Sequence, residues 1–410
     1  MVPNGWRKTD LSTFISIKHG FAFKSEYFSE SGDYILLTPG SFYEVGGYRD
    51  QGAKTKYYVG EIPDLYLLSK GELLVAMTEQ AAGLLGSTLF VPKSNVYLHN
   101  QRLGKIVIEA HEQITKEFLY LTFNAPYARK QISSQSTGTK VKHTSPDKLK
   151  SVVCLLPPID EQRKIAEIIS TWDKAISTTE CLIDNSKQQK KALMQQLLTG
   201  KKRLLDDSGK PFEGEFMRLS MGELANIDKN SLGKKTPNDY EFNYISLSDV
   251  ETGKISQTLE KHQFSSSPSR ARRVISDGDI LLATVRPNLQ GFAKVKKEHD
   301  GMIASTGFSV LTPKKQVSGD YLYHYIFSCH ITGQINALVV GSNYPAINSS
   351  DVSGLKVYIP SYEEQVKIAN VLNNADESLR MLERQLTDLK QEKKALMQQL
   401  LTGKRRVKVN

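Results

Sequence analysis

The sequence of 410 residues contains only three cysteines, which is too few and an odd number for a secreted protein built on disulfides. Its longest apolar runs, such as residues 280–285, are strand-sized and fall far short of the ~18 residues of a membrane helix. Residues 1–7 have no apolar stretch of the kind that a signal peptide contains. These absences predict a cytoplasmic protein outside the membrane.

Motifs for catalysis are also missing. The sequence has no Gly-x4-Gly-Lys-Ser/Thr phosphate loop, which argues against an internal ATP motor. Asn124-Ala125-Pro126-Tyr127 approaches the Asn-Pro-Pro-Tyr loop of amino-methyltransferases but lacks the first proline, and a helix stop is the better interpretation. Glu392-Lys393-Lys394 matches half of a nuclease motif inside a predicted helix, where a solvated helix face is expected. We predict no catalytic residue and no cofactor in this chain.

A metal site is not expected either. Cys154 lies in the apolar run 152–156, and we expect it in the core. Cys181 is replaced by Arg384 in the second copy of an internal repeat described below. Cys329-His330 has no companion pair at the spacing of a zinc site.

The charge balance is basic. The chain has 54 Lys and Arg against 44 Asp and Glu, a formal net charge of +10. This excess favours a polyanionic partner.

The strongest positive signal is an internal repeat. Residues 156–204 and 359–407 align without a gap at an offset of 203, with 23 identities in 49 positions. Upstream the similarity continues more faintly at offsets of 207 and 210, as in residues 69–74 against 276–281. The chain therefore consists of two copies of one unit, each with a variable first part and a nearly identical last part.

The two parts of each copy have different patterns. The variable parts, roughly 5–155 and 215–358, show short apolar runs punctuated by Gly, Pro and Asn, which is typical of an α+β domain. The repeated parts have a proline before the start (Pro157, Pro360) and a glycine after the last apolar residue (Gly200, Gly403), as helices do. Acidic pairs at 160–161 and 363–364 suit a helix N-terminus better than a general acid/base pair.

The apolar spacing in the two helices alternates between four and three, which predicts a coiled-coil seam with polar breaks at Thr179, Ser186, Lys190 and Lys393. The apolar seam positions are Ile165, Ile169, Trp172, Ile176, Ile183, Leu193 and Leu197 in copy one, and Ile368, Leu372, Leu379, Leu382, Leu386, Leu389, Leu396 and Leu400 in copy two. We expect the helices to pair antiparallel; the alternative is two amphipathic helices that lie on their own domains.

The predicted fold is α+β, a pseudo-twofold tandem repeat of two globular domains separated by two long antiparallel coiled-coil helices. The expected order is a first domain at 1–155, a helical spacer at 156–212, a second domain at 213–358 and a second spacer at 359–410. Two similar surfaces on matched rigid helices suit a polymer target, and the basic charge favours DNA. Two domains with different contact residues would read two different short sequences separated by an unread gap.

The sequence resembles the specificity subunits of type I restriction–modification enzymes. The resemblance lies in Leu156 to Gln162, its counterpart Ile359 to Gln365, the two Leu-Leu-Thr-Gly-Lys helix ends, and Gly20 to Ser25, which is similar to the opening of many target-recognition domains of that family. The order of domain and helix covers essentially the whole chain.

This resemblance implies that each target-recognition domain reads one half of a bipartite, asymmetric site in double-stranded DNA, and that the helices set the spacer. It also implies two modification subunits that methylate adenine N6 with S-adenosylmethionine, and restriction subunits that cleave DNA with ATP and Mg. The specificity subunit itself would be non-catalytic.

Candidate DNA contacts lie in loops that differ between the copies. Gly138 and Gly341 are shared, but the residues beside them differ, as expected for readers of different sequences. Lys and Arg suit guanine, and Asn suits adenine; an ordinary polar surface loop remains the alternative. The predicted contacts are Gln101, Arg102, Lys140, Lys142, His143, Arg270, Arg272, Arg273, Arg286, Asn343 and Tyr344.

Two other functions remain open from the sequence. One is a coiled-coil scaffold without sequence-specific DNA binding. The other is a specificity subunit of a system in which methylase and nuclease are fused. Saturable binding to one defined duplex over competitor DNA would argue against the scaffold. Co-purification of separate modification and restriction chains would argue against the fused system.

Overall fold

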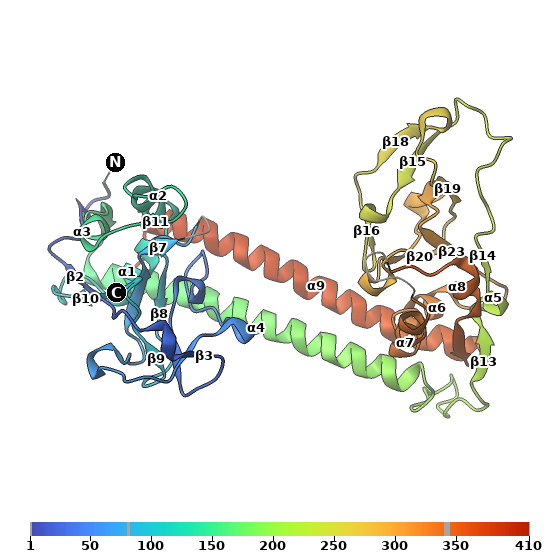
Figure 1. The fold of residues 1–410 in the computed structure, drawn as a ribbon, viewed down its shortest axis with the longest axis horizontal. Helices are drawn as coiled ribbons and strands as arrows, with labels where there is room; N and C mark the ends of the chain where they lie inside the picture. Colours follow the sequence, from blue (N-terminus) through green and yellow to red (C-terminus); the bar gives the residue numbers. More distant parts are fainter. Residues whose placement is uncertain (1, 80–82, 340–344, 410) are drawn as a thin grey trace. The chain divides into compact units, whose positions relative to one another are not determined.

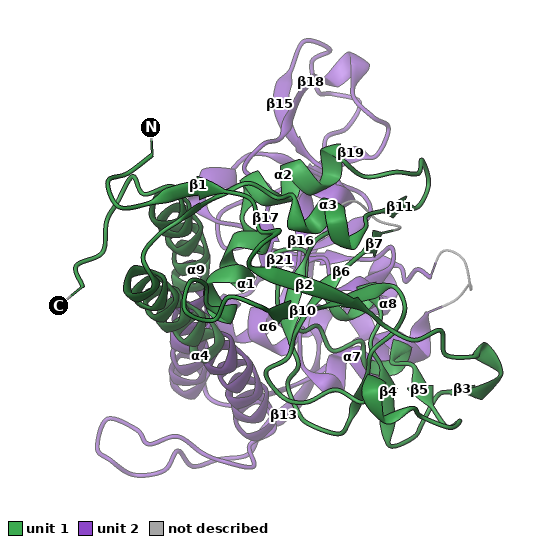
Figure 2. Cartoon of the chain, turned by 90° about the vertical axis from the view of Figure 1, so that its left-hand side faces the viewer, with its two compact units in different colours: residues 1–179, 385–410 green, residues 180–384 purple. Residues whose placement is uncertain are grey.

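The computed structural model describes residues 2–79, 83–339 and 345–409. Its contacts divide the chain into two compact units (Figure 2). Unit 1 contains residues 1–179 and 385–410, and unit 2 contains residues 180–384. Each unit therefore holds one globular domain, the first part of the helix that follows it and the last part of the other long helix.

The described residues of the globular part of unit 1 form short strands and three short α-helices (Figure 1). Its main sheet has the order β2-β10-β6-β8, and a second sheet has the order β3-β5-β4-β9. The strands are β1 Arg7–Thr9, β2 Ile15–His19, β3 Phe28–Ser29, β4 Tyr34–Leu36, β5 Tyr57–Tyr58, β6 Leu73–Ala76, β7 Thr78–Glu79, β8 Thr88–Phe90, β9 Tyr97–Leu98, β10 Leu103–Ile108, β11 Lys142–His143 and β12 Cys154–Leu156. The helices are α1 Lys116–Asn124, α2 Pro126–Ser134 and α3 Pro146–Lys150.

The globular part of unit 2 repeats this plan. Its main sheet has the order β14-β23-β20-β21, and a second sheet has the order β18-β15-β22-β19. The strands are β13 Met217–Ser220, β14 Ala225–Ile227, β15 Glu241–Ile245, β16 Val250–Glu251, β17 Lys254–Ile255, β18 Glu260–Gln263, β19 Ala271–Val274, β20 Ile280–Ala283, β21 Phe292–Lys294, β22 Ile303–Ser305, β23 Phe308–Pro313 and β24 Lys356–Ile359. The helices are α5 Met221–Leu224, α6 Gly319–Tyr325, α7 Cys329–Leu338 and α8 Ser349–Gly354.

The register of the strand that leads into each long helix is the same in both units. Arg7 pairs with Leu156 in unit 1, and Met217 pairs with Ile359 in unit 2. Met217 lies 210 residues after Arg7, and Ile359 lies 203 residues after Leu156, which are offsets found in the repeat. The second sheets also share a parallel pair, β4 with β9 and β15 with β22. The predicted α+β tandem repeat is therefore confirmed.

Two long helices follow the globular parts, α4 at Ile159–Leu197 and α9 at Tyr362–Leu401. Each begins two residues after the predicted proline and is followed by a glycine with positive φ, +69° at Gly200 and +66° at Gly403. Glycine ends a helix in this left-handed conformation without the steric penalty of a side chain. At 1.5 Å per residue, each helix is on the order of 60 Å long.

All fifteen predicted apolar seam residues are buried or half-buried. Those at the helix ends pack into domain cores, because Ile165 and Ile169 join Leu400 and Leu401 in the core of unit 1. The equivalent residues of unit 2 form the same arrangement in its own core. The start of each long helix therefore packs into its own domain, as the second interpretation of the seam expected, but the end of the other long helix packs into the same core, which that interpretation did not expect. The polar seam residues Lys190 and Lys393 pair with the other helix.

Ion pairs join α4 to α9 inside each unit. In unit 1, Lys393 pairs with Asp173, and in unit 2, Lys190 pairs with Asp376. Asp173 and Asp376 are equivalent in the repeat, as are Lys190 and Lys393. In unit 2, Lys187 also lies 3.6 Å from Glu383. The partner residue on α9 moves from 376 to 383 when the residue on α4 moves from 190 to 187, so the two helices are antiparallel. The lysines that break the apolar seam are thus neutralised by carboxylates.

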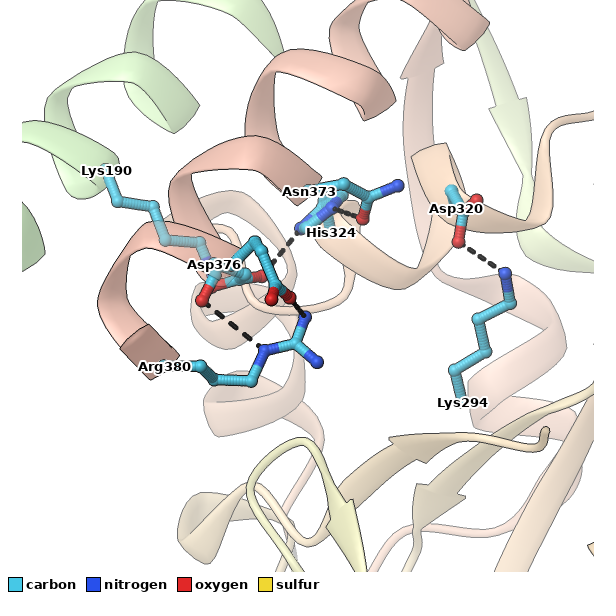
Figure 3. A network of polar contacts seen from close by, with 8 residues as sticks. Lys190, Lys294, Asp320, His324, Asn373, Asp376 and Arg380 are labelled. Atoms are coloured by element: carbon cyan, nitrogen blue, oxygen red, sulfur yellow. Dashed lines mark hydrogen bonds and ion pairs between the residues drawn. The ribbon is translucent and has the colours of Figure 1, made fainter. Parts of the chain in front are cut away.

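Figure 3 shows the surroundings of the unit 2 pair. His324 of α6 lies against α9, with its Nε2 2.8 Å from Oδ1 of Asn373 and its Nδ1 3.9 Å from Oδ2 of Asp376. Burial lowers the pKa of His324, which favours the neutral imidazole. Unit 1 has Leu121 at the equivalent position, so this polar cluster is a difference between the copies.

An arginine clamp follows each long helix. In unit 2, Nε and Nη2 of Arg203 donate to the two carboxylate oxygens of Glu364 at 2.8 and 2.7 Å, and the guanidinium lies over Phe216. In unit 1, Arg406 makes the same forked contact with Glu161 and lies over Trp6. Basic residues after a helix commonly neutralise the carbonyls at its end. These two arginines instead bind the buried carboxylates at the start of the partner helix.

A glutamine next to each clamped glutamate fixes the helix start. Gln162 Nε2 donates to the carbonyl of Pro157, and its Oε1 accepts from the amide of Thr115 at 3.0 Å. Gln365 makes the equivalent bonds to Pro360 and Ser318. The Glu-Gln pair of each copy therefore ties the helix N-terminus to its own domain. No described helix is both long and apolar enough to cross a membrane.

Candidate nucleic-acid interface

In each main sheet, the same arrangement of backbone hydrogen bonds surrounds the end of one inner strand, β6 in unit 1 and β20 in unit 2. We refer to these as the central strands. In unit 1, the amide of Met77 donates to the carbonyl of Arg102, and the carbonyl of Met77 accepts from the amide of Thr144, both at 3.0 Å. The strand end is thus held between the turn at 100–102 and the loop at 137–144. We call residues 77–79, 100–102 and 137–144 the recognition frame of unit 1.

Unit 2 has the equivalent recognition frame, formed by residues 284–286, 306–307 and 345–347. The amide of Thr284 donates to the carbonyl of Gly307 at 2.8 Å, and the carbonyl of Thr284 accepts from the amide of Ile347 at 2.9 Å. Ile347 and Thr144 are separated by the repeat offset of 203. The two units therefore hold the same three segments together and differ in the side chains that these segments carry.

The loop of the unit 1 frame is a narrow hairpin. Thr137 and His143 exchange backbone hydrogen bonds of 3.0 and 2.8 Å, and β11 pairs with β7. Gly138 has a φ of +99°, and a Cβ there would lie 2.1 Å from the carbonyl oxygen of Val141. Glycine is therefore required at this shared position for steric reasons. The hairpin presents Lys140 and His143 to solvent and leaves Lys142 half-buried.

The predicted residues Gln101 and Arg102 lie on the opposite side of the same frame. Both are exposed, and the amide of Gln101 donates to the carbonyl of Phe21 at 2.9 Å. Gly20 permits this approach, because a Cβ there would be 2.1 Å from the carbonyl oxygen of Asn100. The glycine that begins the Gly20 to Ser25 motif is thus explained by this close backbone contact. All five predicted contacts of unit 1 meet at one end of its main sheet.

A buried carboxylate that sequence reasoning missed organises the unit 1 frame. Glu79 follows the central strand, and its Oε2 accepts from the amides of Gly83, Leu84 and Leu85 at 2.8–3.0 Å. Three amide donors compensate the loss of water around the carboxylate. The Nζ of Lys142 also lies 4.0 Å from Glu79 Oε1. A glutamate after an apolar strand gives no signal of this role, since most glutamates are exposed.

Arg129 of α2 is the second residue that was missed. Its Nη2 donates to the carbonyl of Gly83, the residue whose amide bonds Glu79. Burial lowers the pKa of Arg129 to about 10, while the neighbouring carboxylates Glu79 and Glu44 oppose this shift. The guanidinium therefore stays charged at neutral pH and adds positive charge beside the frame.

In unit 2 the residue equivalent to Glu79 is Arg286. It is exposed and left-handed, with φ 50° and ψ 51°, directly before a 3-10 helix at Pro287–Leu289. Its amide donates to the carbonyl of Pro345 at 2.7 Å. A non-glycine residue in this conformation is uncommon and is held here by the frame. The predicted contacts Asn343 and Tyr344 lie outside the described residues.

The arginines at 270–273 lie around β19, in the second sheet. Arg270 is exposed, and its carbonyl accepts from the amide of Thr306, which is part of the unit 2 frame. Arg272 is half-buried, 4.9 Å from the ring centre of Phe264. Arg273 pairs with Asp228 at 2.9 Å, and both side chains are largely buried. For Arg273 this geometry favours a structural ion pair over the predicted DNA contact, because its guanidinium already has a carboxylate partner.

The residues resembling a methyltransferase loop have structural roles. Asn124 ends α1 and Pro126 begins α2, as expected for a helix stop. Nδ2 of Asn124 donates to Oγ1 of Thr88 at 2.8 Å, and Oδ1 of Asn124 accepts from the backbone amide of Thr88. Cys154 is buried in β12, and burial raises the pKa of its thiol to about 12. Among the described residues, no three His, Cys, Asp or Glu side chains gather in a possible metal site.

The family model of the type I restriction modification DNA specificity domain matches residues 3–185 and again residues 213–391. The chain belongs to this family. It is 26% identical over 309 residues to the MjaVIII specificity subunit of Methanocaldococcus jannaschii, covering 71% of both chains. It is 21% identical to the EcoKI specificity subunit of Escherichia coli K12, covering 90% of this chain and 81% of that one.

Solved structures of specificity subunits share the fold. The crystal structure of a type I restriction–modification S subunit from M. genitalium matches with a TM-score of 0.60 at 15% identity, over 98% of both chains. A second match, with a TM-score of 0.57 at 16% identity and the same coverage, comes from a study of complex assembly in a type I system. The suspected resemblance to this family is therefore confirmed, and both globular parts are specificity domains.

Proposed function

We propose that this chain is the DNA-specificity subunit of a type I restriction–modification complex, in which each unit reads one half of a bipartite, asymmetric site. The observation that carries this proposal is the recognition frame. Both units hold the same three segments with equivalent backbone bonds, yet the side chains that they present differ. Two domains that recognise different DNA sequences require the same backbone arrangement with different side chains at the contact surface.

The chemistry of the two frames supports different targets. The unit 1 frame presents Arg102, Lys140, Lys142 and His143, which are donors suited to guanine O6 and N7 or to phosphate. The unit 2 frame presents Arg286, with Arg270 nearby in the second sheet. We propose that these residues, together with Gln101, Arg272, Asn343 and Tyr344, form the DNA contacts.

The helices are proposed to set the spacer and to bind two modification subunits. Methylation of adenine N6 with S-adenosylmethionine, and cleavage with ATP and Mg, would belong to the modification and restriction subunits. The Glu-Gln tie and the arginine clamp support the spacer role, because they fix both ends of the helices to folded domains. This chain would then contribute recognition and geometry without a catalytic step.

The experiment is methylation mapping. The chain is co-expressed with its modification subunit in a host that lacks adenine methylation, and N6-methyladenine is located by genome sequencing. We expect one motif with two defined halves and a gap of fixed length. A stable complex that methylates no site, or methylates without sequence preference, would contradict the proposal.

A further inference from the structure

The turn that follows β20 in unit 2 contains two left-handed residues. Arg286 and Gln290 both have a φ of 50°, with ψ of 51° and 41°, and the 3-10 helix Pro287–Leu289 lies between them. Residues other than glycine adopt this conformation rarely and at a cost in free energy, which the surrounding contacts must offset. Backbone strain of this kind clusters at ligand-binding sites. We call residues 286–290 the strained turn.

Contacts with three other segments fix the backbone of the strained turn. The amide of Arg286 donates to the carbonyl of Pro345 at 2.7 Å, on one side of the turn. On the other side, the carbonyl of Gln290 accepts from the hydroxyl of Thr252 at 3.2 Å. Pro287 is buried between them, and its ring fixes its own φ. The conformation of the turn is therefore set before a ligand binds.

The strained turn presents three side chains to solvent, those of Arg286, Asn288 and Leu289. Leu289 is 65% exposed. A single exposed leucine is ordinary on a protein surface, but this one lies beside an asparagine at the edge of the unit 2 recognition frame. In the major groove, asparagine bonds N6 and N7 of adenine, and an apolar side chain contacts the C5-methyl group of thymine. The two residues together therefore match both halves of an A·T pair.

The spacing of these residues fits neighbouring bases. Consecutive Cα atoms are about 3.8 Å apart, and consecutive base pairs are stacked about 3.4 Å apart. Asn288 and Leu289 can therefore reach the same base pair or two adjacent ones. Arg286, two positions earlier, remains available for guanine or phosphate next to them.

The corresponding segment of unit 1 is built differently. Its first residue is Glu79, which is 6% exposed, and its carboxylate is bound by the amides of residues 83–85. Strand β8 begins nine residues after Glu79, whereas β21 begins six residues after Arg286. The segment thus differs between the units in length and in the direction of its first side chain. A base contact made by the strained turn would belong to the half-site of unit 2 alone.

We propose that the strained turn recognises an A·T pair in the half-site of unit 2, with Asn288 on adenine and Leu289 against the methyl group of thymine. This inference rests on the proposed function and deepens it. Asn288 and Leu289 are specificity residues in addition to the DNA contacts that the sequence predicts. The shape of the turn supports specificity, because a backbone that is already ordered loses little conformational entropy on binding.

Base analogues test the two contacts separately. Deoxyuridine in place of thymidine removes only the C5-methyl group, and 7-deazaadenine removes the N7 acceptor. The purified complex with its modification subunits is bound to duplexes that carry the methylated motif with one analogue at a time. At one A·T position we expect deoxyuridine to weaken wild-type binding about three- to fourfold, as for one buried methyl group, and 7-deazaadenine to weaken it about fivefold. Leu289→Ala should abolish the first effect, and Asn288→Ala the second.

Methylation mapping tests the same residues in the cell. Asn288→Ala should reduce the preference for A·T at that position about tenfold and leave the other half-site unchanged. A chain in which residues 213–358 also replace residues 1–155 identifies the half-site of unit 2. The matched control is Asn226→Ala, an exposed residue of β14 that pairs with Thr312, at the end of β23 away from the frame. Thermal unfolding of each variant verifies that it remains folded.

Three results would overturn the inference. One is a half-site of unit 2 without an A·T pair, and another is equal sensitivity of the wild type and both variants to the analogues at every A·T position. The third is an equal loss of affinity of Asn288→Ala for all duplexes, which would assign Asn288 to phosphate. Absence of any bipartite motif with the wild-type chain would instead contradict the proposed function.

Discussion

At the residue scale, the recognition frames show which parts of the site the sequence predicts. The glycine shared by the two loops marks the unit 1 hairpin, because its steric requirement and its positive φ are local properties. Glu79 and Arg129 were not predicted, since their roles depend on contacts with residues four to 46 positions away. The ion pair of Arg273 with Asp228 is equally non-local. The sequence therefore predicts the position of the contact loops better than it predicts what each of their side chains contacts.

Glu79→Gln tests the organisation of the unit 1 frame. The amide keeps one acceptor oxygen but loses the charge that strengthens three backbone hydrogen bonds, so we expect unit 1 to lose about 1–3 kcal/mol of unfolding free energy. Both tryptophans, Trp6 and Trp172, lie in unit 1, so their fluorescence during urea unfolding measures this loss. The exposed residue change Glu112→Gln is the control. Equal unfolding curves for the two variants would show that Glu79 does not hold the frame.

His99 predicts a pH dependence of unit 1. Burial lowers its pKa to about 4, and its Nε2 lies 3.0 Å from the carbonyl oxygen of Leu103. The unfolded chain takes up the proton near pH 6.5, whereas the folded chain does so only near pH 4. The contribution of the neutral histidine is therefore complete above about pH 6.5 and is lost as the pH falls to 4, a change of about 3 kcal/mol.

The comparison of His99→Gln with the wild type isolates this effect from the titration of carboxylates. Glutamine retains a donor for the Leu103 carbonyl but does not titrate. Between pH 7 and 4.5, the variant should lose about 2–3 kcal/mol less stability than the wild type, as measured by tryptophan fluorescence in urea. Parallel losses in the two proteins would refute the buried neutral histidine. The charged groups Lys105, Glu72 and His19 face His99 in both proteins and cancel in the comparison.

At the scale of elements, the long helices were the most predictable feature. Proline before the start, glycine after the end and the 4-3 spacing are all local, and α4 and α9 begin and end where these signals place them. The two- and three-residue strands were not predicted individually, because so short a strand is fixed by its neighbours in the sheet. The division of each helix between two units also had no sequence signal, since it arises from long-range packing.

The arginine clamps predict unit-specific loss of stability. Arg203→Ala leaves the buried carboxylate of Glu364 without its forked partner, and we expect the thermal midpoint of unit 2 to fall by about 5 °C. Arg406→Ala should do the same to unit 1 through Glu161. Tryptophan fluorescence follows unit 1 alone, so only the second variant should shift that signal. Calorimetry then detects the change in unit 2. An identical response of both signals to both variants would contradict separate clamps.

The lysines in the helix seam are tested by charge exchange. Asp173→Lys and Lys393→Asp should each destabilise unit 1, because each places like charges together in a half-buried site. The double variant should regain about 0.5–1 kcal/mol relative to the sum of the single effects, as a double-mutant cycle in urea measures. Strict additivity would mean that the two residues do not interact.

At the scale of the whole molecule, the spacer role of the helices makes a quantitative prediction. Inserting four residues into both helices adds about one turn, or ~6 Å. At ~3.4 Å per base pair, the preferred gap between the half-sites should lengthen by about one or two base pairs. Methylation mapping measures the gap directly. A variant that keeps its half-sites and its original gap would remove the spacer role.

A chain with two copies of one domain tests most directly whether each globular domain recognises its own half-site. Residues 1–155 are replaced by a second copy of residues 213–358, the clamps and helices are kept, and the methylated motif is mapped beside that of the wild type. We expect a motif in which the half-site of the second domain occurs twice and the other half-site is absent. Retention of both original half-sites, in a folded complex that still methylates DNA, would contradict it.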